Sequence, residues 1–323
     1  MHIKIALKFR PFSHEEGTRC LIPFSSWEAQ IFPAKVFFLD LSPAGTHVEM
    51  NLPIEGPVDG FTILQDLEKG RIEVFGKAKR GFFRYYLTPD ALSFARGETF
   101  PLDFIEKHDL VISKKRLSFG VHKKQDWDLI QRRCETEEFF PFWVRISQFI
   151  PKIPLPYRGI GTDFLLMQGK LKETFQAAFL GILSPRLKDE RYLGLIPDQE
   201  ISPEFSSLGI IHEGARQIEE LLFFEDDENW NFLPHLPKEL HAGRFVSFET
   251  KKGDFIDFEW SKKELKKVVI HPAQSRQIKP ILQRSLKTYR VRKSLRHKGE
   301  TKARDEGLNL EKGQIIYLDK FLH

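Results

Sequence analysis

The chain has 323 residues, of which 41% are hydrophobic, and carries a formal net charge of +5. This length predicts two or three structural units, since a domain usually has about 100–150 residues, and the composition excludes disordered and fibrous proteins. Membrane helices and structural zinc sites are excluded as well, because no apolar stretch reaches about 18–20 residues and the chain has only Cys20 and Cys134, so we expect a cytoplasmic protein that contacts no membrane.

Residues 1–118 are predicted to form an N-terminal antiparallel β domain. Apolar residues alternate with polar ones from Ile3 to Phe9, which is the period of a strand with one buried face, and Pro11 ends this pattern. Glycine, proline and aspartate separate the further strands, which we expect at residues 34–41, 47–52, 60–64, 71–76, 82–87 and 92–96.

Aromatic residues are concentrated in the strand predicted at residues 82–87. Phe82, Phe83, Tyr85 and Tyr86 give each face of this strand aromatic rings. The rings belong either to a packed sheet core or to a ligand-binding surface, and we favour the core because aromatic side chains commonly fill the interior between sheets.

Residues 119–230 are predicted to form a helical middle region. The spacing of apolar residues changes to that of amphipathic helices, which we expect at residues 126–133, 137–150, about 163–183 and 211–224. Pro151 and Pro185 end two of these helices, and a surface loop is expected at residues 195–207.

Residues 231–323 are predicted to form a C-terminal β domain. Gly253 provides the tight turn of a hairpin between strands at 245–250 and 255–260, and Ile256, Phe258 and Trp260 share one face of the second strand. Further strands are expected at residues 265–270, 286–291 and 315–318. The predicted fold class is therefore α+β, with an antiparallel β-sandwich domain at each end and a small helical layer between them.

The sequence lacks the motifs of common cofactor and metal sites. Gly159 and Gly161 lack the third glycine of a dinucleotide site, and no histidines have the spacing of zinc ligands, so we expect no cofactor and no metal. Glycoside hydrolysis needs two carboxylates about 5–10 Å apart, which sequence spacing does not determine. Asp163 and Glu213 are the candidate catalytic acids, although acids on a helical layer are usually solvated.

Basic residues accumulate toward the end of the chain. Residues 244–323 hold 20 Lys or Arg against 10 Asp or Glu, whereas residues 121–243 hold 14 against 20. Arg290, Arg292, Lys293 and Arg296 are candidate polyanion-binding residues, but a solvated hairpin tip or charge neutralisation within the molecule explains the same pattern. Tyr289 is the one aromatic residue in the basic stretch at residues 284–304, so nucleic acid is not an expected partner, since base recognition generally adds stacking rings.

A resemblance to a known family is confined to residues 231–270. The segments at 231–239, 243–245, 252–260 and 265–270 resemble the C-terminal β-domain of inverting glycoside hydrolases of the α-L-fucosidase type. In that family a β-sandwich precedes an α/α barrel that holds the active site, and this β-domain closes the chain. The helical middle region here is too short for such a barrel, so the resemblance implies that the barrel is missing or reduced, and no position matches the catalytic carboxylates.

Our leading hypothesis is a carbohydrate-associated protein that retains the shell of such a hydrolase and binds a glycan or a protein partner without cleaving it. Sugar binding uses aromatic faces and hydrogen-bonding charges, for which the candidate ligand-binding residues are Trp127, Trp143, Trp230 and Arg133. The alternatives are an active glycosidase with a reduced site and a polyanion-binding scaffold that acts through the basic stretch.

Overall fold

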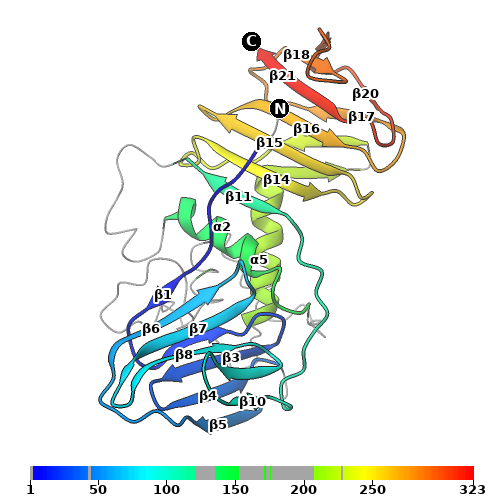
Figure 1. Cartoon of the computed structure of the whole chain (residues 1–323). Coiled ribbons are helices and arrows are strands. Elements are labelled where there is room, and N and C mark those ends of the chain that lie inside the picture. Colours follow the sequence, from blue (N-terminus) through cyan, green and yellow to red (C-terminus); the bar gives the residue numbers. More distant parts are fainter. Residues whose placement is uncertain are drawn as a thin grey trace. The chain divides into compact units, whose positions relative to one another are not determined.

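The computed structural model describes residues 3–42, 45–120, 135–152, 171, 175, 207–226 and 228–323. The chain folds into two compact units, each assembled from separate stretches of sequence (Figure 1). We call Lys8–Ile112 together with Asp126–Ala215 the N-terminal unit. The C-terminal unit comprises Met1–Leu7, Ser113–Gln125 and Arg216–His323. These units do not follow the three consecutive segments that we predict from the sequence.

Two antiparallel sheets form the β-structure of the N-terminal unit. One has six strands in the order β1-β6-β7-β8-β9-β10, and the other has four in the order β2-β3-β4-β5. The strands of the larger sheet are β1 (Phe12–Ser13), β6 (Asp59–Asp66), β7 (Arg71–Ala78), β8 (Gly81–Leu87), β9 (Ala91–Phe94) and β10 (Thr99–Pro101). Those of the smaller sheet are β2 (Thr18–Leu21), β3 (Trp27–Phe32), β4 (Lys35–Asp40) and β5 (His47–Asn51).

One hydrophobic core contains side chains from both of these sheets. The smaller sheet contributes Trp27 and Phe38, and the larger sheet contributes Val74 and Tyr85. Phe104 joins the core, because Trp27 and Phe38 each pack edge-on against its ring with centroids 5.3 Å apart. Since successive side chains of a strand point to opposite faces, burial of one face of the six-stranded sheet directs the alternate residues away from the core.

The C-terminal unit contains a seven-stranded sheet, in the order β11-β14-β15-β16-β21-β18-β19, and a four-stranded sheet, in the order β12-β13-β17-β20. All neighbouring pairs are antiparallel except β13 and β17. The larger sheet comprises β11 (Arg116–Phe119), β14 (Gly243–Glu249), β15 (Phe255–Ser261), β16 (Glu264–His271), β18 (Thr288–Arg292), β19 (Glu300–Ala303) and β21 (Ile316–Leu322). The smaller comprises β12 (Phe223–Asp226), β13 (Asn229–Phe232), β17 (Arg276–Ile281) and β20 (Leu308–Leu310).

Two helices are described over their full length, α2 (Thr136–Ile146) and α5 (Ser207–Leu222). They meet at Trp143, whose indole Nε1 donates a hydrogen bond of 2.8 Å to the carbonyl oxygen of Ile211. Gly214 permits this close approach, because a Cβ atom at that position would lie 1.9 Å from Cζ2 of Trp143. The helix predicted at 126–133 and, apart from residues 171 and 175, the one predicted at 163–183 lie outside the described residues.

The antiparallel β-structure that we predict at both ends of the chain is confirmed. The hairpin of β14 and β15 turns at Gly253, whose φ of 82° has the positive sign that such a turn requires. Neither α2 nor α5, nor any other helix in the described part of the chain, combines the length and the hydropathy of a membrane-spanning segment.

The prediction of a strand from Ile3 to Phe9 is wrong, because these residues join no sheet. Ile3 and Ile5 instead pack against the apolar cluster of Val246 and Val269 in the C-terminal unit. The backbone of this segment is bound by arginine side chains, since Arg244 Nη1 donates to the carbonyl oxygen of Lys4 at 3.3 Å and Arg116 Nη1 to that of Leu7 at 3.2 Å. Ile3 and Phe9 are thus buried without a ladder of backbone hydrogen bonds, whereas Ile5 is half-buried and Leu7 is exposed.

A buried carboxylate connects several elements of the C-terminal unit. Asp254 is fully buried beside the β14–β15 turn and accepts hydrogen bonds from the backbone N–H of Ala273 at 2.8 Å and from Thr250 Oγ1 at 3.1 Å. The guanidinium group of Arg276 on β17 forms an ion pair with the same carboxylate. Arg276 Cζ also lies 5.7 Å from the ring centroid of Trp230, so one acidic residue positions the cation that covers this ring.

We expect the Asp254→Asn variant to be destabilised by about 3–5 kcal/mol, because the substitution leaves the charge of Arg276 buried without its counter-ion. The free energy of unfolding in urea, followed by circular dichroism, measures this loss. Asp305→Asn is the matched control, since Asp305 pairs with Arg304 at 3.3 Å on the exposed surface and should contribute little. Equal effects of the two substitutions would contradict the structural role of Asp254.

Candidate functional site

The face of the six-stranded sheet that points away from the N-terminal core carries the strongest concentration of ligand-binding chemistry among the described residues. On β7, Ile72 and Val74 are buried while Phe75 and Lys77 are not, and on β8 Tyr85 is buried between two more exposed neighbours. This alternation is the period of a half-buried strand. We call this side of β6, β7 and β8 the outer face.

Register places aromatic and charged side chains of the outer face directly opposite one another. Along the β7–β8 ladder, Lys77 pairs with Phe82, Phe75 with Arg84, and Glu73 with Tyr86. Directly opposed side chains on one sheet face lie close enough to interact. The outer face is therefore a ladder in which rings and charges alternate across two strands.

The charges at the centre of this ladder are fixed by one acid. Glu73 forms ion pairs with Arg84 at 3.3 Å and with Arg71 at 3.4 Å. Each arginine also lies over a ring, Arg71 with its Cζ 3.8 Å from the centroid of Tyr86 and Arg84 5.4 Å from that of Phe75. Because these cations hold both an acid and a ring, the rings keep a defined orientation.

A hollow of about 680 Å³ opens at the end of this ladder, near the β7–β8 turn. Phe82 lines it with 88% of its surface exposed, which is unusual for a phenylalanine. Asp59, Lys77 and Arg96 also line it, and none of the three forms an ion pair or side-chain hydrogen bond within the described part of the chain. Unengaged charges beside an exposed ring can bind a ligand that has both an apolar face and hydroxyl groups.

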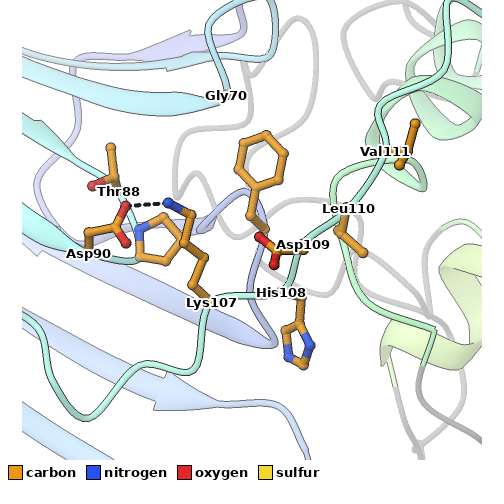
Figure 2. Close-up of a pocket in the computed structure, with 10 residues that line it drawn as sticks. Gly70, Thr88, Asp90, Lys107, His108, Asp109, Leu110 and Val111 are labelled. Atoms are coloured by element: carbon orange, nitrogen blue, oxygen red, sulfur yellow. Dashed lines mark hydrogen bonds and ion pairs between the residues drawn. The ribbon is translucent and has the colours of Figure 1, made fainter.

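A second hollow of about 390 Å³ lies at the opposite end of β8, beyond the turn that leads into β9 (Figure 2). One pair of its charged groups is engaged, since Lys107 Nζ lies 2.7 Å from Asp90 Oδ2, and this hydrogen bond raises the pKa of Lys107. The ring of Phe24 forms another wall, and Phe24 has a positive φ of 69° that few bulky residues adopt. This site offers fewer unengaged groups than the outer face.

Two of the three tryptophans predicted to bind sugar, Trp143 and Trp230, are among the described residues, and both are buried inside the protein. Trp143 is fully buried between α2 and α5, and Phe139 and Phe175 lie against its ring. Trp230 on β13 is fully buried against Phe223, with Arg276 over its ring. Both rings have packing partners on their faces, so neither offers a surface on which a sugar could lie.

The other predicted residues of the middle region have varied positions. Trp127, Arg133 and Asp163 lie outside the described residues. Glu213 lies on α5 and is half-buried, so only one of the two candidate catalytic acids has a described position. Among the described residues, no group of three or more His, Cys, Asp or Glu side chains gathers as a metal site would require.

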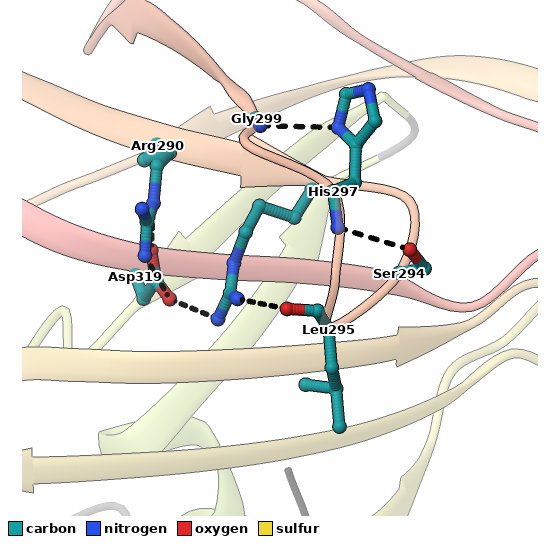
Figure 3. A network of polar contacts seen from close by, with 7 residues as sticks. Arg290, Ser294, Leu295, His297, Gly299 and Asp319 are labelled. Carbon is teal, nitrogen blue, oxygen red and sulfur yellow. Dashed lines mark hydrogen bonds and ion pairs between the residues drawn. The ribbon is translucent and has the colours of Figure 1, made fainter.

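Three of the four predicted polyanion-binding residues have an acidic partner, which is Asp319 for Arg290 and Arg292 and Glu311 for Lys293. Arg290 Nε lies 2.7 Å from Asp319 Oδ1, and Arg292 forms an ion pair with the other oxygen of the same carboxylate (Figure 3). Burial alone would raise the pKa of Asp319, but the hydrogen bonds and positive charges of Arg290 and Arg292 outweigh burial and hold it below its ordinary value. Lys293 and Arg296 are exposed at the hairpin tip.

The outer face is the functional candidate that sequence reasoning missed. The rings of Phe82 and Tyr86 have the same alternation as those of Phe83 and Tyr85, so the sequence does not show which pair faces the core. The sequence signal that could have identified the outer face is the type of residue beside the rings. Phe82 and Tyr86 share their face with Arg84, whereas Phe83 and Tyr85 share theirs with Leu87.

Comparison with family models and with curated proteins identifies no relative of this chain. No protein-family model matches the chain, and no curated protein matches it. The assignment of a function therefore depends on the geometry and chemistry of the described surfaces.

We expect the Asp319→Asn variant to lose about 1–3 kcal/mol of stability at pH 7, because two guanidinium groups lose their counter-charge. A carboxyl group with a lowered pKa in the folded state stabilises it above the unfolded value of about 3.9 and loses this effect as the pH falls through the folded value. The difference between wild type and variant should therefore shrink as the pH falls below about 4. Urea unfolding at pH 7, 5 and 3 measures it.

Glu306→Gln provides the control for this measurement. The pKa of Glu306 is also lowered, by its hydrogen bond with Lys302, but this carboxylate is exposed and solvent screens the pair. Its substitution should change the free energy of unfolding little at any of the three pH values. A difference for Asp319→Asn that stays constant from pH 7 to pH 3 would contradict the assigned role.

Proposed function

We propose that the protein binds carbohydrate without cleaving it, and that the outer face of the six-stranded sheet is the binding surface. The observation that carries this proposal is the exposure of the Phe82 ring in a hollow where Asp59, Lys77 and Arg96 have no ion-pair or side-chain hydrogen-bond partner in the described part of the chain. Burial of this ring against a ligand would be favourable, and Phe75 and Tyr86 line the same hollow, so the apolar surface extends beyond one side chain.

The chemistry of the hollow suits a sugar. The C–H face of a pyranose ring is apolar and lies against aromatic rings such as those of Phe82 and Tyr86, while its hydroxyl groups need hydrogen-bond donors and acceptors. Lys77 and Arg96 supply donors and Asp59 supplies an acceptor. A volume of about 680 Å³ falls within the range of sites for small ligands, which supports binding of a short oligosaccharide or of one segment of a longer glycan.

Binding without hydrolysis is favoured by the acids of this surface. Glycoside hydrolysis requires two carboxylates, one on each side of the scissile bond. Asp59 is the one carboxylate among the described residues that line the hollow, and the nearby Glu73 is held by Arg71 and Arg84. The glycosidase alternative is thus less well supported at this surface than binding alone.

The broader assignments that accompany this function are also proposals. We propose that the two sheets of the N-terminal unit form a β-sandwich, supported by the core to which both contribute. The resemblance of residues 231–270 to the β-domain of α-L-fucosidase-type hydrolases supports a carbohydrate-associated role. A cytoplasmic location is supported by the thiol of Cys20, which is buried and forms no disulfide.

We expect Phe82→Ala to weaken glycan binding by about tenfold or more, because truncation removes the exposed ring that a sugar would cover. A glycan array first identifies an oligosaccharide that the full chain retains, and titration calorimetry then compares the variants. Phe255→Ala is the matched control, since Phe255 is also exposed but lies on β15 of the C-terminal unit. Because both phenylalanines are exposed, neither substitution should change stability much.

Three results would reject the proposal. The first is an array on which no oligosaccharide is retained. The second is an equal loss of affinity for Phe82→Ala and Phe255→Ala. The third is release of reducing sugar by the pure protein that the Asp59→Asn substitution abolishes, because this result would show hydrolysis at the outer face.

A further inference from the structure

A groove of about 720 Å³ in the C-terminal unit combines positive charge with an apolar wall. One side is the tip between β18 and β19, which contributes Lys293, Leu295 and Arg296. The other side is the approach to β21, which contributes Lys312 and Tyr317. Three cations thus converge on one groove from two segments that are distant in sequence.

The tip that carries Arg296 is held in a defined conformation (Figure 3). Arg292, anchored by Asp319, donates a hydrogen bond of 3.0 Å from Nη1 to the carbonyl oxygen of Leu295. His297 closes the turn, since its Nδ1 accepts a hydrogen bond of 3.1 Å from the backbone N–H of Gly299. A cation on a supported loop loses less conformational freedom on binding than one on a loose loop.

The groove retains unbalanced positive charge. Lys293 Nζ lies 2.8 Å from Glu311 Oε1 in an exposed pair. Arg296 and Lys312 form no ion pair among the described residues, and Asp319 balances only one of the two arginines behind the tip. A ligand with negative charge would therefore be attracted to this groove.

We propose that this groove binds an acidic polysaccharide, through its carboxylate or sulfate groups. Arg296 and Lys312 would pair with the anionic substituents, and the Tyr317 ring with its apolar neighbours would contact the sugar. The Oε1 atom of Gln314 is buried without a hydrogen-bond partner in the described part of the chain, so this side chain gains a partner by turning toward a hydroxyl group in the groove.

A nucleic acid is a weaker match to the same surface. Binding of single strands usually uses several exposed rings on which successive bases stack. Here Tyr317 is the one ring among the described residues that line the groove, and it is half-buried. This site is separate from the outer face and involves a different unit, so it extends the proposed function with a second, charge-selective contact.

The test measures binding of the full chain to four probes by calorimetry: heparin as a sulfated glycan, polygalacturonate as a carboxylated glycan, neutral dextran, and single-stranded DNA. We expect binding to heparin, polygalacturonate or both, weakened by salt, with the two acidic glycans showing which substituent is preferred. The double variant Arg296→Gln/Lys312→Gln should lose about tenfold or more in affinity. Phe82→Ala should retain it.

The matched control is Lys298→Gln, because Lys298 has the same charge on the same exposed tip but does not line the groove. Its substitution should leave the affinity within about twofold of wild type. An equal loss in Lys298→Gln would show diffuse attraction and overturn the proposal, as would tighter binding of DNA than of both acidic glycans, or binding of neither. None of these outcomes affects the proposal for the outer face.

Discussion

The two-residue period of β7 and β8 is the constraint on which the proposed function depends. Val74 and Tyr85 are buried in the core to which both sheets of the N-terminal unit contribute. A strand cannot turn one residue inward without turning its neighbour outward, so Phe75 and Tyr86 are directed away from that core. The rings of the outer face are therefore a geometric consequence of core packing, and the arginines and Glu73 hold them in place.

Buried acids have a comparable organising role in the C-terminal unit. Asp254 holds Arg276 over Trp230, and Asp319 holds Arg290 and Arg292 beneath the hairpin tip. Such carboxylates divide the basic residues into two groups. Arginines that face an acid serve the fold, whereas Arg296 and Lys312 remain available on the surface. The surplus of charge in residues 244–323 thus overstates how many cations a ligand can reach.

The fold could be predicted from sequence where the two faces of a strand have different surroundings. β7, β8 and β15 show this alternation, and the sequence predicts all three. β3 is not among the predicted strands, although Trp27, Ala29 and Ile31 alternate with Glu28 and Gln30. Glu28 is nevertheless buried, and it forms an ion pair with Arg19. Ile3–Phe9 shows the opposite error, since its residues alternate in polarity but join no sheet, and Leu7 is exposed.

The candidate site was harder to predict than the fold. Residue type identifies rings that are able to bind sugar, but only register and burial separate the exposed Phe82 from the enclosed Trp143 and Trp230. The same limit applies to the basic stretch, where sequence does not show that Arg290 and Arg292 share Asp319 across a distance of 27 to 29 residues. Contacts between distant residues decide which functional groups are free.

The placement of residues 3–7 has a consequence for biosynthesis. Arg244, which binds the backbone of Lys4, lies 240 positions later in the chain. During translation, Ile3 and Ile5 leave the ribosome long before Val246 and Val269 exist to cover them. Residues 3–7 must therefore stay uncovered while the N-terminal unit forms, and the C-terminal unit becomes complete only when this segment meets Arg244, Val246 and Val269.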